Sequence, residues 1–198
     1  MQWMMKTNIE IETIANSVLA KYVKRGGVFK VFQNIMESEC IKYKEINSVN
    51  INFLGALSKN KTQSYIFVNG SIDNIGRKHF TIAHELGHYF LSHELHDNAG
   101  FCTNSDIVEE GHQKNPIERE ANYFASCLLM PEEKVKNAFF ALLSNATRGR
   151  IKDFLLVKKD SSFGIWRGIS DELTKRYGVS EAALRFRLLG LKLTRFEF

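Results

Sequence analysis

The pentapeptide His84-Glu85-Leu86-Gly87-His88 constrains this chain more than any other feature of its sequence. Two histidines four positions apart on a helix lie on one face, so both imidazoles can bind one metal ion. Residues 75–93 carry apolar side chains at helical spacing, which predicts that helix. In this H-E-x-x-H pattern the glutamate can take a proton from metal-bound water. The pattern therefore predicts a zinc site with Glu85 as general base in amide hydrolysis.

A catalytic zinc ion usually has three protein ligands and one open position, so a third ligand is needed. Glu118 and Asn122 lie four apart in the helical segment 117–129. Glu118 could complete a His₂Glu site, and Asn122 could hydrogen-bond the second ring nitrogen of a ligand histidine.

Three rival ligands remain open at this stage, namely Glu120, His93 and His112. Glu120 points away from the Asn122 side of its helix and is interpreted as a surface charge. His93 is interpreted as a helix-end histidine close to carbonyl groups.

Hydrolysis also needs a group that stabilises the oxyanion and an edge on which a peptide can lie. Candidate oxyanion partners are Tyr123, His93 and His112. The strand 64–68, with Tyr65, Ile66 and Phe67, is the predicted edge for substrate binding.

The periodicity predicts an α+β fold, in which a small antiparallel sheet packs on a helical bundle that carries the H-E-x-x-H helix. The predicted helices are 9–24, 28–37, 75–93, 117–129 and 132–143. The predicted strands are 40–46, 49–54 and 64–68. Residues 95–115 are predicted to be a long loop, and residues 145–168 are ambiguous.

The C-terminal part is predicted to be a basic helical extension. Of 198 residues, residues 145–198 hold 12 Lys+Arg and 6 Asp+Glu, whereas residues 1–144 hold 15 and 16. We therefore divide the chain into a zinc peptidase domain (1–144) and an extension (145–198). A helix-turn-helix-like element is predicted over 169–190.

This element could enter a DNA groove through Arg185 and Arg187. However, Leu184, Phe186 and Leu188 make its second helix strongly apolar. Packing against the domain, or docking of a protein partner, is therefore the stronger expectation, and nucleic-acid binding is the weaker one.

The cysteines and the N-terminal segment bear on the compartment. Three cysteines without a C-x-x-C pair indicate a reducing environment. No secretory signal is recognisable, and no apolar run approaches the roughly 20 residues that span a bilayer. The chain is therefore expected in the cytoplasm, without a membrane partner.

Three blocks of the sequence, RKHFTIAHELGHYFLSH, EREANYFASCLLMPEE and KRYGVSEAALRFRLLGL, resemble the ImmA/IrrE family of metallo-endopeptidases in order and spacing. The resemblance implies a gluzincin-like zinc site with ligands His84, His88 and Glu118, and with Glu85 as catalytic base. It also implies an intracellular bacterial or phage-related protein of the shorter, ImmA-like kind.

Members of that family cut helix-turn-helix repressors, so the resemblance implies a protein substrate of this regulatory class. The leading hypothesis is a hydrolase, a zinc metalloprotease that cleaves a repressor or antitoxin-like protein of a mobile element or stress response. The alternative is a DNA- or repressor-binding regulator whose zinc site is silent or structural.

Overall fold

The computed structural model describes residues 5–22, 27–50, 52–94, 99–103 and 115–197. The helices are α1 (Asn8–Tyr22), α2 (Val28–Ser38), α3 (Ile75–Phe90), α4 (Pro116–Leu129), α5 (Glu132–Thr147), α6 (Phe163–Tyr177) and α7 (Glu181–Gly190). The strands are β1 (Ile41–Ile46), β2 (Phe53–Lys59), β3 (Ser64–Asn69), β4 (Ala99–Thr103), β5 (Leu155–Lys158) and β6 (Thr194–Glu197). The predicted α+β class is confirmed, and the predicted helices match α1 to α5 closely.

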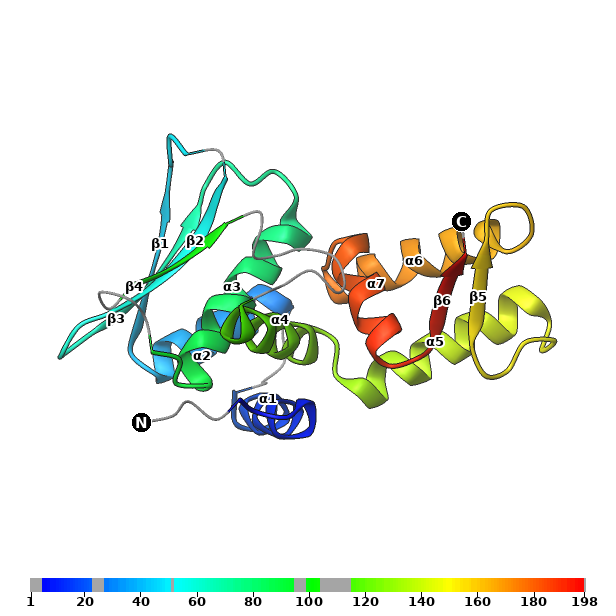
Figure 1. Ribbon diagram of the computed structural model, residues 1–198, viewed down its shortest axis with the longest axis horizontal. Coiled ribbons are helices and arrows are strands. Elements are labelled where there is room, and N and C mark those ends of the chain that lie inside the picture. Colours follow the sequence, from blue (N-terminus) through cyan, green and yellow to red (C-terminus); the bar gives the residue numbers. More distant parts are fainter. Residues whose placement is uncertain (1–4, 23–26, 51, 95–98, 104–114, 198) are drawn as a thin grey trace.

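The elements form two groups that meet along the middle helices (Figure 1). The sheet of β1 to β4 lies at one end, α3 and α4 lie in the centre, and α5 to α7 with β5 and β6 lie at the other end. None of the described helices is long and apolar enough to cross a membrane.

The four-stranded sheet is mixed, with the order β1-β3-β2-β4. β1 and β3 are parallel, whereas β2 is antiparallel to both β3 and β4. The prediction of an antiparallel sheet is therefore wrong for β1, because β3 inserts between β1 and β2. The prediction of a continuous loop over 95–115 is also wrong, since it contains β4.

The strand 64–68 is not the free edge that the sequence suggested. In β3, Tyr65 aligns with Lys42 of β1 on one side and with Ser58 of β2 on the other. A strand paired on both sides has no free row of backbone groups for an added peptide. The prediction of a substrate edge at Tyr65, Ile66 and Phe67 is therefore wrong, and the outer strands within the described residues are β1 and β4.

The helix α3 carries the pentapeptide of residues 84–88 in the middle of the fold. Its first turn is capped by Asn74, whose side-chain oxygen accepts a hydrogen bond from the Arg77 N–H at 2.9 Å. Every residue from His79 to His88 is buried, because the sheet covers one side of α3 and α4 covers another. Polar side chains on this helix are thereby removed from bulk water.

The helices α3 and α4 approach each other closely at Gly87. A methyl group at Gly87 would lie 3.0 Å from both the Cα and the carbonyl oxygen of Ala121, and 3.3 Å from the Phe124 ring. Because a side chain there would press on the backbone of Ala121, glycine favours this close separation. The small residues Gly87 and Ala121 thus let the two helices approach.

The C-terminal helices are where the sequence predicted them, although α6 begins earlier, at Phe163. α6 ends at Gly178, whose φ of 61° is left-handed, and Ser180 caps α7 by accepting a hydrogen bond from the Ala183 N–H at 3.2 Å. The proposed boundary at residues 144/145 falls inside α5. The division into two domains stays a prediction.

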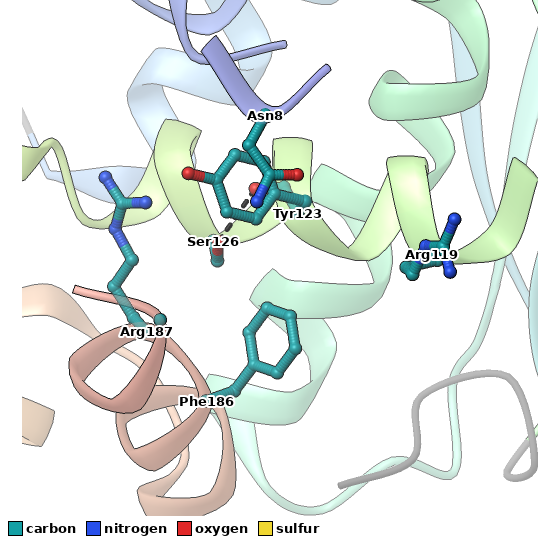
Figure 2. A pocket seen from close by; sticks show the side chains of 7 residues that line it. Asn8, Arg119, Tyr123, Ser126, Phe186 and Arg187 are labelled. Atoms are coloured by element: carbon teal, nitrogen blue, oxygen red, sulfur yellow. Dashed lines mark hydrogen bonds between the residues drawn. The ribbon is translucent and has the colours of Figure 1, made fainter. Parts of the chain in front are cut away.

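Arg187 fastens α7 to the rest of the protein. Its side chain is 1% exposed, donates from Nε to the Met130 carbonyl at 3.0 Å, and pairs with Glu12 of α1 at 2.5 Å. Figure 2 shows Phe186 and Arg187 of α7 across a small pocket from Tyr123 of α4. The stronger expectation, packing of α7 against the domain, is confirmed, and the suggestion that Arg187 could contact DNA is wrong.

Replacing Gly87 by alanine tests the close approach of α3 and α4. We expect Gly87→Ala to lower the free energy of unfolding by about 1–3 kcal/mol, because the methyl group forces the two helices apart. The control is Gly168→Ala in α6, where a methyl group meets nothing within 4 Å. That change should raise stability by about 0.5–1 kcal/mol. Urea denaturation measures both, and equal stability of Gly87→Ala and wild type would contradict the packing.

Arg187→Ala should destabilise the protein by about 3–5 kcal/mol, because it leaves Glu12 without its buried partner. Arg185 is the matched control, since its guanidinium lies over the Phe196 ring at 4.2 Å near the surface. Arg185→Ala should cost about 0.5–1 kcal/mol. Comparable losses for both variants in denaturant titrations would refute the role of Arg187.

Candidate metal centre

The two histidines of the pentapeptide are buried together on α3. His84 is fully buried and His88 is 2% exposed. Their spacing of one helical turn places the two Nε2 atoms 2.9 Å apart. The predicted convergence of the imidazoles is therefore present.

Glu118, in the first turn of α4, supplies a third atom at the same point. Its Oε2 lies 3.0 Å from Nε2 of His84 and 3.3 Å from Nε2 of His88. Zinc bonds of about 2.0–2.1 Å in a tetrahedral site would place neighbouring ligand atoms about 3.3 Å apart. The structure thus brings His84, His88 and Glu118 into a group of the size that zinc requires.

Asn122 sets the orientation of the first imidazole. Its Oδ1 lies 2.8 Å from Nδ1 of His84, and both side chains are buried. An amide oxygen only accepts hydrogen bonds, so Nδ1 of His84 is the donor. In the neutral ring Nε2 then carries the lone pair, as metal binding requires. The geometry places Asn122 as the sequence predicted.

A second chain of contacts sets the orientation of His88. Nδ1 of His88 lies 2.9 Å from Nδ1 of His93, whose Nε2 lies 3.2 Å from Oε2 of Glu120. Burial lowers the pKa of His93 to about 3, so its ring is neutral near pH 7. Nε2 of His93 donates to the carboxylate, its Nδ1 accepts from His88, and Nε2 of His88 is left with a lone pair.

Glu120 and His93 therefore differ from their sequence-based interpretation. Glu120 is 2% exposed and is not a surface charge, because His93 and the backbone N–H of Lys6, at 2.8 Å, cover it. The ring nitrogens of His93 contact His88 and Glu120. The sequence-based interpretation had placed His93 near helix-end carbonyl groups instead. Neither side chain reaches the metal position as a ligand. The fold of the N-terminal segment over α4 could not be read from the sequence.

The three converging atoms lie at hydrogen-bond distances from one another, so their close approach is stabilised by a cation between them, either an imidazole proton or a metal ion. Burial opposes ionisation of Glu118, but its contacts with His84 and His88 outweigh burial and hold the pKa of this carboxyl well below its usual range. A buried carboxylate facing two imidazole nitrogens is a donor set that suits a divalent metal ion, which replaces the proton between them when it binds. The residues present fit zinc.

Glu85 lies beside this group, between α3 and the sheet, and is 1% exposed. A methyl group at Gly55 of β2 would lie 3.2 Å from Oε1 of Glu85, so glycine leaves room for the carboxylate. Ligand atoms of Glu85, His84 and Cys102 lie within 4.8 Å of one another. Cys102 of β4 was missed by the sequence analysis, because a single cysteine has no diagnostic spacing.

The remaining predicted site residues are not brought to the centre. The Tyr123 hydroxyl donates to Glu12 at 3.1 Å and borders the pocket between α4 and α7 (Figure 2). His93 is nearby, but both of its ring nitrogens are engaged. These contacts do not support an oxyanion role for Tyr123 or His93. His112 lies outside the described residues.

The contacts of Glu120 predict that a substitution of this residue, which is not a metal ligand, lowers the affinity for zinc. Glu120→Ala removes the acceptor that fixes the His93 ring, so zinc affinity should fall by about 10–100-fold. Glu120→Gln keeps an oxygen acceptor and should lose less, and Glu133→Ala, at an exposed position, should lose nothing. Competition with a chromophoric chelator measures the dissociation constant. An unchanged value for Glu120→Ala would contradict this arrangement.

Comparison with known proteins adds three findings. The family model Peptidase_M78, described as the IrrE N-terminal-like domain, matches residues 43–189. No curated protein matches the sequence. Among solved structures, a Mycobacterium tuberculosis transcriptional regulator is similar, with a TM-score of 0.53 and 16% identity. The match covers 90% of this chain but 46% of that one, so this likeness concerns the fold alone.

Proposed function

The chain belongs to the Peptidase_M78 family, because the IrrE N-terminal-like domain covers most of its length, and on this premise we propose that it is a zinc-dependent endopeptidase. One observation carries the proposal. His84, His88 and Glu118 converge with separations of 2.9–3.3 Å, and the carboxylate of Glu85 is buried beside them.

Each residue has one role in the proposed mechanism. His84, His88 and Glu118 hold the zinc ion, which when bound supplies Lewis acidity toward water and the scissile carbonyl. Glu85 accepts the proton of the attacking water and returns it to the leaving amine. Its burial between α3 and the sheet excludes bulk water and strengthens these charge interactions.

The substrate is proposed to lie along β4 instead of β3. Within the described residues β4 pairs with β2 only, and Cys102 of β4 lies close to Glu85. An extended peptide added to the outer row of β4 would therefore pass near the catalytic carboxylate. This position replaces the incorrect edge at residues 64–68.

The proposed substrate is an intracellular regulatory protein, a helix-turn-helix repressor or antitoxin-like protein. This part of the proposal rests on the family resemblance. A DNA- or repressor-binding regulator with a silent metal site is the second candidate, favoured by the basic charge of residues 145–198, which hold 12 Lys+Arg and 6 Asp+Glu. The burial of Arg187 weakens this candidate, because one of the two expected DNA contacts is taken up by Glu12.

The decisive test separates metal binding from catalysis. Glu85→Gln should keep stoichiometric zinc and lower peptide-bond cleavage by about 10²–10⁴-fold, because it removes only the general base. Glu118→Gln should lose most of the zinc, because it removes a ligand. Metal analysis of the purified chains gives the zinc content.

Cleavage is measured in the cell of origin, by comparing new protein N-termini in cells that produce wild type or Glu85→Gln. Wild type should generate N-termini that the variant does not. Identical sets of N-termini, with zinc bound to both chains, would favour the regulator over the peptidase.

A further inference from the structure

A second group of possible metal ligands lies next to the first and shares one residue with it. His84, Glu85 and Cys102 each place one ligand atom within 4.8 Å of the other two, and all three are buried. The proposed zinc centre uses His84 and leaves Cys102 without a role. A buried thiol at the catalytic side of a metal site calls for an explanation.

The sheet directs Cys102 toward the centre. Cys102 of β4 is the register partner of Gly55 in β2, and directly paired residues point their side chains to the same face. A methyl group at Gly55 would lie 2.7 Å from Cγ2 of Thr81 and 3.2 Å from Oε1 of Glu85, which are both on α3. The Cys102 side chain therefore also faces α3, from the side where Glu85 lies.

The geometry is compatible with a bond from sulfur to the metal. Zinc–sulfur and zinc–nitrogen bonds of about 2.3 and 2.0–2.1 Å would set the sulfur about 3.6 Å from a ligand nitrogen in a tetrahedral site. The ligand atoms of Cys102 and His84 already lie within 4.8 Å. Binding requires the sulfur to approach the ligand nitrogen of His84 to about 3.6 Å.

We propose that Cys102 is a fourth protein ligand, which competes with water for the open position of the zinc centre. The inference rests on the proposed function, because it assumes the ion held by His84, His88 and Glu118. When the sulfur binds, the S–H bond breaks, a metal–sulfur bond forms, and the proton passes to the Glu85 carboxylate and then to solvent.

This ligation gives the chain two states of one centre. With sulfur bound, the centre has four protein ligands and resembles a closed structural site. With sulfur withdrawn, the fourth position accepts water, and Glu85 is placed to act as base. The strand that carries the sulfur is also the proposed docking strand, so Cys102 governs entry to the site from that strand.

Cobalt(II) tests the proposal directly, because a thiolate ligand gives cobalt an intense charge-transfer absorption in the near ultraviolet. Wild type loaded with one equivalent of cobalt should show this band, and Cys102→Ala should lose it. Cys40→Ser is the matched control, since Cys40 is exposed and outside the centre, and it should keep the band. Cys102→Ser, with thermal unfolding as a check on folding, replaces the alanine variant if that variant does not fold.

Two negative outcomes are distinguishable. Two results would overturn the role of Cys102 and leave the peptidase proposal intact. In the first, wild type binds stoichiometric cobalt but shows no band. In the second, Cys102→Ala binds stoichiometric cobalt and shows a band equal to that of wild type. Failure of wild type to bind cobalt or zinc at all would overturn both. A further expected result is that zinc-loaded Cys102→Ala generates the new N-termini faster than wild type does.

Discussion

The close approach of α3 and α4 is the constraint on which the site depends. Gly87 lets the backbone of Ala121 come within contact distance. The polar groups of the site lie within about one helical turn of this crossing, on α3 and on α4. Because the helices are this close, Glu118 reaches both histidines of α3 and Asn122 reaches His84. Larger side chains at the crossing would separate the three ligand atoms by more than a metal ion can bridge.

The second physical feature is the fixed direction of the imidazole lone pairs. Asn122 holds the His84 ring from α4, and the Glu120–His93 pair holds the His88 ring. The backbone of Lys6 in turn holds Glu120, so the N-terminal segment stabilises the centre through two intervening side chains. The contacts among the side chains are buried, and the contact of Lys6 is partly buried. Burial strengthens each contact and makes the loss of a partner costly. The centre is thus organised for a cation before the cation binds.

The sequence was sufficient for those parts of the site that depend on local periodicity. The spacing of His84 and His88, and of Glu118 and Asn122, places each pair on one face of its own helix, and the structure shows the two faces meeting. The spacing within a helix could not reveal what covers its other face. Glu120 points away from Asn122 as predicted, yet the N-terminal segment and His93 enclose it there.

Long-range pairing explains the main errors in the predicted fold. The insertion of β3 between β1 and β2 is decided by contacts between distant strands, and alternation of apolar residues is the same in a parallel or an antiparallel strand. β4 lies in a polar, glycine-containing stretch that resembles a loop, and the C-terminal pair β5 and β6 joins residues far apart in sequence. Cys102 became visible as a possible ligand only once β4 was placed against β2.

X-ray absorption spectroscopy of the zinc-loaded protein tests the central claim most directly. We predict one zinc ion per chain, with two imidazoles and one carboxylate oxygen at about 2.0–2.2 Å, whichever group fills the fourth position. Glu118→Gln should remove the oxygen contribution together with most of the zinc. A zinc shell without imidazole, or a purified chain that takes up no zinc from replete buffer, would contradict the account.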